Sequence, residues 1–548
     1  MATYDKIKDD VKGIVTITQD IEELRKICYL LLNIIEESAS TIKKLTTEVQ
    51  DLRDEVNRLK GEHGQPKFKP KLPGEDHSSE DERNPKDKPK VPKKPKAKKH
   101  LLEIMRQEIC HVDPSLLPND AVFKGYQSVI VQDIIIQADN IEFKKEVFYS
   151  PSLGKNFIGE VPAGYAGDFG PSVKALILNL HHESNMTESA IVKFMNTHGI
   201  LISSATVARI ILGSHEEFKD EKAAIIDAGL TVTIFQHLDD TGAKVNGKQS
   251  YTHVLCNPFY TAYFTRPDKS RITLLEILSN GNLVFRFDDV AYEIMQNMNL
   301  PEKALALLKS MQPALILDRQ GLDQLLNSIY PDKDTYHTAK RIILEASAIA
   351  GYRDYRRAIP ILLCDDAPQF KQITQEIALC WVHEGRHYKK LTPLSAVFQL
   401  EVKSFIGEFW GYYRALLQFK ANPTADAAEK LSIGFDALFN TEVKYNALAE
   451  RMKKTREHKH ELLTVLRYPE IPLHNNPAEL GARAQARKRD ISFHTKTEIG
   501  TLAKDTIMTV VQTAKKLKVN VYNYLRDRIS KSMDMRPLAE EILVQSSA

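Results

Sequence analysis

Cysteine is scarce in this 548-residue sequence, and its spacing excludes two kinds of site. No two of the five cysteines form a Cys-x-x-Cys pair, so neither a disulfide framework nor a cysteine-ligated zinc site is expected. The thiols are predicted to be reduced, which points to the cytoplasm. The five residues are Cys28, Cys110, Cys256, Cys364 and Cys380.

Long apolar runs and a nucleotide-binding loop are also missing. No apolar stretch approaches the roughly 20 residues that a membrane-spanning helix needs. The sequence does not open on a positively charged lead and an apolar core, which would mark a secretion signal. We therefore expect a cytoplasmic protein with no membrane partner, associated with the nucleoid when it is bound to DNA. No Gly-x-x-x-x-Gly-Lys-[Ser/Thr] loop occurs, so no nucleotide cofactor is expected.

The composition predicts a folded chain of several domains. Apolar residues make up 43% of the sequence and the mean hydropathy is −0.33, values typical of a folded, water-soluble protein. The net charge is only +3, but Lys and Arg cluster before residue 100 and again from Arg483 to Arg489. These local basic surfaces favour a polyanionic partner.

Residues 1–62 are expected to form a coiled coil resembling a leucine zipper. Apolar residues repeat every seven positions from Ile21 to Leu59, with mostly β-branched residues at the first position and leucine three residues later. This pattern predicts a parallel two-stranded coiled coil, and so a homodimer. The alternative is a single helix packed on its own domain. The first positions of the repeat are Ile21, Cys28, Ile35, Ile42, Val49 and Val56. The positions three residues later are, in the same order, Leu24, Leu31, Ser38, Leu45, Leu52 and Leu59, where Ser38 is the only polar residue.

Three segments are expected between the coiled coil and the main domain. Residues 63–100 are rich in Pro, Lys and Glu and predict a disordered basic linker, which either contacts phosphates or is only solvated. Residues 101–165 are expected to be a small β-rich module, with a strand over Ser128–Ile136. Residues 166–225 are expected to be helical. Helices over Met186–His198 and Ser203–Leu212, joined by a glycine-containing turn, either form a DNA-reading helix-turn-helix or simply pack.

Residues 226–394 are expected to contain a β-sheet with acidic pairs at two strand ends. A strand over Val232–Leu238 ends at Asp239-Asp240, and Asn246-Gly247 marks a hairpin turn before strands at Ser250–Cys256 and Thr261–Thr265. Helices follow to about residue 350. The apolar run Ile359–Cys364 predicts a buried central strand, which ends at Asp365-Asp366. From about Lys371 onward the chain is expected to be helical throughout.

The acidic pairs suggest a metal site, although such a pair is more often a turn or a helix cap. Neighbouring strand ends bring carboxylates together, and clustered carboxylates favour hard cations such as Mg²⁺. Pro477 predicts a helix start that places Glu479 in the first turn. Arg483 and Arg487 lie along roughly one face of that helix, followed by Lys488 and Arg489. Basic residues beside an acid suit a phosphate-bearing substrate, while the alternative is an ordinary solvated Glu–Arg pair four residues apart.

Four sequence blocks resemble the DDE transposases of bacterial insertion sequences, and within them the insertion-sequence sixty-six group. The order and spacing of the blocks carry the resemblance, which extends over nearly the whole chain. The blocks are His237–Gly242 with Val245–Lys248, the strand ending at Asp365 with Cys380–Arg386, Asn475–Glu479, and Thr513–Lys516 with Tyr522–Leu525.

The resemblance implies an α/β catalytic core of the RNase H-like type, with a helical insertion at 395–468 and C-terminal helices at 469–548. It also implies a catalytic triad of Asp239, Asp365 and Glu479 that holds two Mg²⁺ or Mn²⁺ ions. The adjacent Asp240 and Asp366 remain alternatives for the two aspartates. Many relatives carry a cysteine zinc module before the helix-turn-helix, whereas residues 101–165 contain only Cys110.

Several further residues are weighed for DNA contacts. Arg483, Arg487, Lys488 and Arg489 are expected to bind DNA. His383 either contacts a DNA phosphate or leaving group, or lies satisfied beside a core tryptophan, Trp381. His181 and His182 are expected at the surface.

Taken together, the residues and the resemblance predict a transposase that binds the inverted repeats at the element ends and the target DNA. It would cleave DNA and transfer strands by two-metal-ion chemistry. A dimeric DNA-binding regulator and a nuclease that never joins ends are the alternative functions.

Overall fold

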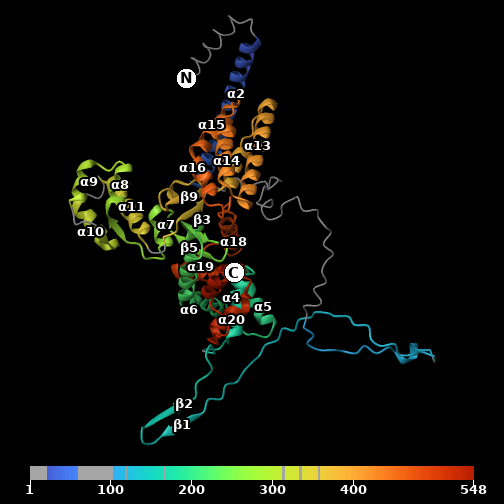
Figure 1. The fold of residues 1–548 in the computed structure, drawn as a ribbon. Coiled ribbons are helices and arrows are strands. Elements are labelled where there is room, and N and C mark those ends of the chain that lie inside the picture. Colours follow the sequence, from blue (N-terminus) through green and yellow to red (C-terminus); the bar gives the residue numbers. More distant parts are fainter. Residues whose placement is uncertain are drawn as a thin grey trace.

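The structure is a computed structural model that describes residues 21–59, 103–118, 120–165, 167–310, 315–331, 336–355 and 358–547. The predicted linker at 63–100 lies outside these residues. The fold is mixed α/β, with a central sheet, a helical region on either side of it and a separate lobe beside it (Figure 1). None of the described helices is both long and apolar enough to cross a membrane.

The central sheet has five strands in the order β5-β4-β3-β8-β9. β3, β4 and β5 are antiparallel neighbours, whereas β8 runs parallel to β3 and β9 runs parallel to β8. The turn between β3 and β4 is the predicted one: Asn246 and Gly247 both have positive φ, which a tight two-residue hairpin requires. The strands are β3 (Phe235–Val245), β4 (Lys248–Cys256), β5 (Thr261–Arg266), β8 (Ile361–Cys364) and β9 (Glu376–Leu379).

Two predictions about this sheet were wrong. β3 does not end before Asp239 but continues to Val245, because its antiparallel pairing with β4 extends to the hairpin turn. Only the parallel pairing of β3 with β8 stops near the acids, at His237 opposite Leu363. The chain after Lys371 is not helical throughout, since β9 adds an edge strand. Four residues are too few for a periodic pattern, and β9 exists because the neighbouring β8 offers an edge to pair with.

Helices cover both faces of the sheet. On one face α18 crosses β3 and β4 while α19 lies on β5, and Val254, Tyr263 and Met508 are buried together beneath them. On the other face Leu238 and Leu255 join the largest hydrophobic core, which includes α7. The helices that frame the sheet are α6 (Ser204–Thr231), α7 (Arg271–Leu278), α18 (Asn476–Ser492) and α19 (Glu498–Lys516).

The lobe beside the sheet is mainly helical, as predicted for the chain up to about residue 350 (Figure 1). It also contains a short antiparallel strand pair, β6 and β7, which was not predicted. Its elements are β6 (Phe285–Phe287), α8 (Asp289–Asn297), α9 (Glu302–Lys309), β7 (Leu315–Leu317), α10 (Arg319–Ile329) and α11 (His337–Arg353).

The segment 395–468 is helical as predicted and has an aromatic core of its own. Trp381, from the helix before it, is fully buried in this core, and its indole N–H donates to the Leu462 carbonyl at 2.9 Å. The predicted packing role of Trp381 is therefore confirmed. The helices are α12 (Trp381–Lys389), α13 (Ala396–Ala421), α14 (Ala425–Phe439), α15 (Asn446–Glu457), α16 (Lys459–Leu462) and α17 (Thr464–Arg467).

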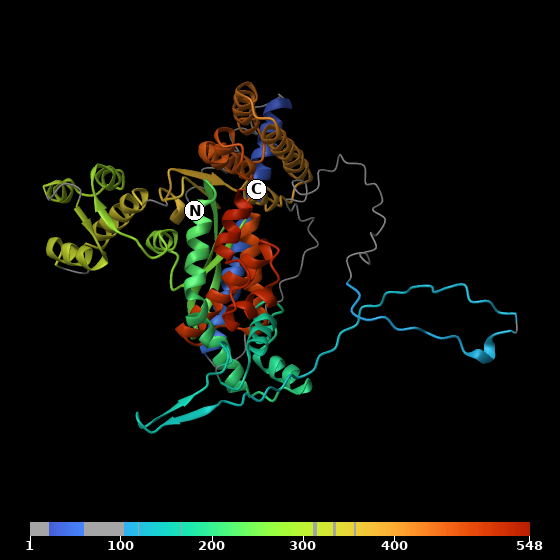
Figure 2. The same cartoon turned by 60° about the horizontal axis from the view of Figure 1, so that its bottom comes forward.

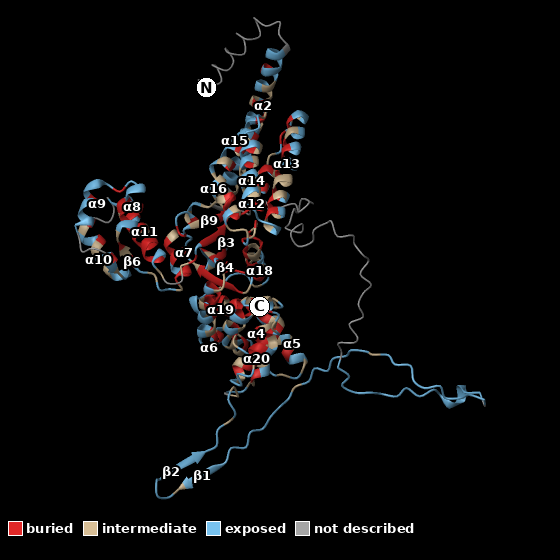
Figure 3. Ribbon diagram, viewed as in Figure 1, coloured by how far each residue is buried: buried red, intermediate tan, exposed pale blue. Residues whose placement is uncertain are grey.

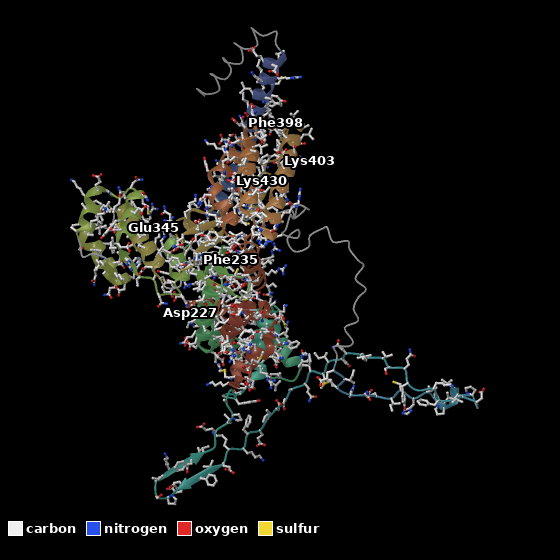
Figure 4. All side chains as sticks on the ribbon, viewed as in Figure 1. Asp227, Phe235, Glu345, Phe398, Lys403 and Lys430 are labelled. Atoms are coloured by element: carbon white, nitrogen blue, oxygen red, sulfur yellow. The ribbon has the colours of Figure 1, made fainter. Side chains whose placement is uncertain are left out.

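The N-terminal helix α2 spans Ile21–Leu59, the range that the seven-residue repeat predicts. One face of α2 docks on the helical segment. Tyr29 stacks on Phe398 of α13 with ring centroids 6.3 Å apart (Figure 4). Asn33 donates from its side chain to the Lys444 carbonyl at 2.9 Å and accepts from the Asn446 backbone N–H at 2.9 Å.

Glu36 completes the docking of α2. Its carboxylate accepts the backbone N–H groups of Leu394 and Ser395, at 2.7 and 2.8 Å, and so satisfies donors at the start of α13. The repeat residues lie on another part of the helix surface and remain exposed. Their exposed fractions run from 40% to 66% for Leu24, Leu31, Ile35, Ile42, Leu45, Val49, Leu52 and Val56. We call these eight residues the heptad seam.

At the opposite end of the molecule, α5 and α6 have the predicted helix-turn-helix shape, with Gly199 in the turn at positive φ. α6 is much longer than expected, because it continues to Thr231 along α19. Three helices complete this end: α4 (Pro171–His182), α20 (Val521–Ser530) and α21 (Leu538–Ser546). α5 spans Glu188–Thr197.

The module predicted over 101–165 is not β-rich. In its described part it holds a short 3-10 helix (Pro114–Leu116) and one hairpin, β1 (Val147–Ser150) with β2 (Lys155–Ile158). The predicted strand over Ser128–Ile136 is absent, because these residues pair with no other described strand and a strand exists only through such pairing. This arm projects from the body and is almost wholly exposed (Figures 2 and 3).

Candidate active site

Asp239 and Asp365 lie just beyond the point where the parallel pairing of β3 with β8 stops. His237 of β3 pairs with Leu363 of β8; Asp239 follows two positions later within β3, and Asp365 directly follows the last residue of β8. Side chains alternate across a strand, so Asp239 is on the same face as His237. Phe235 belongs to that face too, and it packs against the core of the helical segment (Figure 4). Two acids 126 residues apart in sequence are thus brought together by strand pairing.

Asp239 is half-buried, and other acids act on its carboxyl group. Burial is the largest cause that raises the pKa of Asp239, and together with the charges of Asp365, Glu479 and Asp240 it brings that pKa to about 7, against the effect of one hydrogen bond. That hydrogen bond runs from the backbone N–H of Asp240 to Oδ1 of Asp239, at 2.9 Å. A carboxyl group in such surroundings ionises readily only when positive charge is brought to it.

The second acid of each pair has a cationic partner of its own. Asp240 points to the other face of the sheet, 3.7 Å from the Lys269 ammonium. Asp366 lies 3.8 Å from the ammonium of Lys371 and 3.2 Å from Nε2 of His458.

Asn475 fixes the start of α18 to the end of β3. Its Oδ1 accepts from Nδ1 of His237 at 2.9 Å, and its Nδ2 donates to the Leu238 carbonyl at 2.9 Å. Burial lowers the pKa of His237 to about 3, so the ring is neutral. Because the Asn475 oxygen faces it, Nδ1 carries the proton of this neutral ring. The residue next to Asp239 is therefore held directly by the helix that carries Glu479.

Cys380 ties α12 to the same junction. Its Sγ accepts from the Asn475 backbone N–H at 3.2 Å and from the His383 backbone N–H at 3.4 Å. The Trp381 backbone N–H donates to the Leu473 carbonyl at 2.9 Å. The sequence blocks include both Asn475 and Cys380, but sequence reasoning assigned Cys380 no role and Asn475 only a place at the start of the helix. Their partners are far away in the chain, so no local pattern marks them.

α18 passes close over the sheet at Gly481. A Cβ atom at this position would lie 2.6 Å from Cγ1 of Val254 on β4, closer than real Cβ contacts allow. The Tyr263 hydroxyl donates to the Gly481 carbonyl at 3.1 Å. Glycine at 481 therefore sets how near the Glu479 helix comes to the strand ends.

Glu479 lies in the first turn of α18, as predicted. It does not form the alternative pair with Arg483. Instead Arg386 of α12 holds both carboxylate oxygens: Nη1 donates to Oε1 at 2.9 Å and Nη2 donates to Oε2 at 2.8 Å. Sequence reasoning missed Arg386, although it lies in the block that contains Trp381 and His383.

The basic residues after Glu479 point in different directions. Arg483 and Arg487 are exposed. Arg489 is half-buried and donates to the Gly242 carbonyl on β3. Lys488 contradicts its predicted DNA contact, because only 3% of the residue is exposed. Adjacent residues of a helix point about 100° apart, so a single position separates the exposed Arg487 from the buried Lys488, which the sequence could not show.

Lys488 instead joins α18 to α4. Its ammonium donates to the His181 carbonyl, and burial lowers the lysine pKa to about 7, helped by the charge of Lys504 on α19. His181 and His182, expected at the surface, are buried. Burial lowers the pKa of both rings, so both are neutral. The prediction was wrong because α4 turns its C-terminal end toward α18.

His383 is half-buried, with its ring 5.0 Å from that of His387. Its DNA contact stays a prediction.

The three predicted acids supply only carboxylate oxygens, which are the donors that Mg²⁺ and Mn²⁺ prefer. The charges of Asp365 and Glu479 reach Asp239 strongly enough to raise its pKa, so this donor set fits a divalent cation. Within the described residues, no group of three or more His, Cys, Asp or Glu side chains is already close enough together to hold a metal ion. Glu479 is turned to Arg386.

Two comparisons relate the chain to known proteins. A family model described as the Transposase IS66 family matches residues 166–297 and 348–503, together just over half of the chain. The matched segments contain Asp239, Asp365 and Glu479. The chain is also similar to the uncharacterized protein y4jO of Sinorhizobium fredii. Their identity is 29% over 306 residues, which are 56% of this chain and 94% of that protein.

Proposed function

The chain belongs to the IS66 transposase family, and we propose that it cuts and rejoins DNA at a metal-dependent site formed by Asp239, Asp365 and Glu479. Membership of the family supports a function in DNA transposition and implies that the protein binds DNA. One observation carries the finer proposal. Two aspartates lie just beyond the point where the parallel pairing of β3 with β8 stops, and Asn475 ties the helix of a third acid to the same point.

We propose further that the central sheet is an RNase H-like core. Three antiparallel strands followed by two parallel ones, with carboxylates at the two central strand ends, support this assignment. Asp239 and Asp365 are better candidates than Asp240 and Asp366. The latter two pair with Lys269, and with Lys371 and His458, and Asp240 lies on the face away from α18.

In the proposed reaction, Asp239 and Asp365 hold the cations from the sheet and Glu479 holds them from α18. Two Mg²⁺ or Mn²⁺ ions, when bound, would activate the attacking hydroxyl and stabilise the leaving oxygen of a phosphodiester. Asn475 and Cys380 keep α12 and α18 at the strand ends. The exposed Arg483 and Arg487 face solvent beside the site and are available to DNA phosphates.

The products follow from the order of two transfers. Hydrolysis at an element end frees a 3′-hydroxyl, and that hydroxyl then attacks a phosphodiester of target DNA, so no covalent enzyme intermediate is needed. We propose that two copies of the chain act together, joined through the heptad seam as a parallel coiled coil. The exposure of the seam, on a helix whose other face is already docked, supports this pairing.

The proposal is tested with labelled element ends and a target plasmid, with and without Mn²⁺. Glu479→Gln is expected to abolish cleavage and strand transfer, while end binding stays within about threefold, since the change is isosteric and removes one charge. Asp240→Asn is the matched control and is expected to keep activity, because Asp240 faces away from the site. Strand transfer by Glu479→Gln at the wild-type rate would reject the assignment. Binding without nicking would indicate a regulator, and hydrolysis without joining would indicate a nuclease.

A further inference from the structure

The ion pair between Arg386 and Glu479 occupies the proposed catalytic carboxylate. Both guanidinium N–H groups of the pair donate, at 2.9 and 2.8 Å, one to each oxygen. Each oxygen keeps a second lone pair, but the guanidinium charge beside it opposes a cation, so a cation shared with Asp239 competes with Arg386 for Glu479. The pair brings together two helices, α12 and α18, that Cys380 and Asn475 already hold at the strand ends.

This pair is accessible to solvent. The Arg386 side chain is 44% exposed and that of Glu479 is 22% exposed. When such a pair separates, water solvates both charges, so the separation is easy. Its bidentate geometry suits exchange as well, because the planar guanidinium fork fits a phosphate as well as it fits a carboxylate.

A second ion pair on α12 provides the contrast. Glu384, two residues before Arg386, pairs with Arg451 of α15 where the side chains are only 6% and 15% exposed. Thr455 also donates to that carboxylate. Separating this pair would leave charges in the interior, so it fixes α12 on α15 and is not exchangeable. The two ion pairs on α12 thus differ in solvent exposure, which an exchange of partners requires.

We propose that Arg386 is an exchangeable counter-ion of Glu479, which releases the carboxylate to a divalent cation and then binds a phosphate of the DNA. The inference rests on the proposed function, since it takes Glu479 as a metal ligand. Arg386 pairs with Glu479 before the cation and the DNA bind and with a phosphate afterwards. The site therefore carries no unpaired carboxylate in the first state and gains a phosphate contact in the second.

Metal binding without DNA tests the first half of the exchange. Full-length protein is titrated with Mn²⁺ by calorimetry for the wild type, Arg386→Gln and Glu479→Gln. Arg386→Gln is expected to bind Mn²⁺ about threefold to tenfold more tightly, because the cation no longer competes with the guanidinium. Unchanged or weaker binding by Arg386→Gln, with binding lost in Glu479→Gln, overturns the exchange and leaves the proposed function standing. Absence of Mn²⁺ binding in the wild type overturns both.

DNA binding tests the second half. A pre-cleaved end duplex without target DNA is bound at several salt concentrations, in EDTA or in Mg²⁺. With Mg²⁺, Arg386→Gln is expected to bind more weakly and to lower the slope of log K against log salt by about one. In EDTA the variant is expected to match the wild type. Arg483→Gln is the matched comparison and is expected to lower the slope in both conditions. An Arg386→Gln slope equal to the wild type in Mg²⁺ overturns the phosphate contact.

Two further variants, Arg451→Gln and Arg386→Lys, distinguish the proposed exchange from a role of Arg386 in folding. Arg386→Gln is expected to melt within a few degrees of the wild type, whereas Arg451→Gln, which breaks the buried pair, is expected to melt clearly lower. Arg386→Lys keeps the charge without the fork, so it is expected to restore part of the Mg²⁺-dependent DNA affinity. A melting temperature of Arg386→Gln as low as that of Arg451→Gln would assign Arg386 to structure and overturn the exchange.

Discussion

Asn475 is the residue whose removal tests the architecture of the site most directly. Asn475→Ala leaves the His237 Nδ1–H and the Leu238 carbonyl without their partner, and all three residues are buried. A buried polar group that loses its hydrogen bond costs about 1–3 kcal/mol, so the two together are expected to lower the free energy of unfolding by about 2–6 kcal/mol. The start of α18 would also lose its tie to β3, so metal-dependent cleavage is expected to fall while DNA binding is kept.

The assay is urea unfolding followed by tryptophan fluorescence. The sequence has two tryptophans, Trp381 and Trp410, and the backbone of Trp381 bonds to Leu473 near Asn475. Fluorescence therefore reports on this junction. Asn523→Ala, at an exposed helical position, is the matched control and is expected to change stability by less than about 0.5 kcal/mol. A change this small in Asn475→Ala would refute the argument that Asn475 holds α18 to the sheet.

Two further predictions concern Lys488 and α2. The folded pKa of Lys488, about 7, lies below the ordinary lysine value of 10.5, so folding is penalised fully below pH 7 and the penalty fades as pH rises toward 10.5. Relative to Lys488→Met, the wild type should gain about 1–3 kcal/mol of unfolding free energy between pH 7 and pH 9 in urea melts. Lys504, Glu188, His181 and His182 surround position 488 in both proteins, and a flat or falling difference would contradict the burial argument. Leu45→Glu with Leu52→Glu should convert a dimer to a monomer in sedimentation velocity, whereas Thr47→Glu, off the heptad seam, should not. A dimer that survives the double change, or a monomeric wild type, would contradict pairing through the heptad seam.

The sequence predicted those parts of the fold whose signal is local. The seven-residue repeat marked α2, the Asn246-Gly247 turn marked the β3–β4 hairpin, and the apolar run at Ile359–Cys364 marked β8. Short strands were missed, because β6, β7 and β9 are defined by a neighbouring strand and not by their own three or four residues. Ser128–Ile136 failed for the converse reason: its residues favour a strand, but no described strand lies beside it.

The same division holds at the candidate site. Strand patterns and a predicted helix start pointed to the two acidic pairs and to Glu479, and the family resemblance chose Asp239 and Asp365 within the pairs. The pairing of Arg386 with Glu479 joins residues 93 positions apart, so no spacing rule could show it. Lys488 was misplaced because its burial depends on where α4 ends. Sequence indicates which residues carry chemistry, whereas packing decides which partners they meet.

The docking of α2 has a consequence for the distance between the reaction centres of two paired copies. At about 1.5 Å per residue the helix is about 58 Å long. Its first half is fastened to the helical segment by Asn33 and Glu36. In a dimer formed through these helices, a rigid pair of fixed length would set the distance between the two reaction centres.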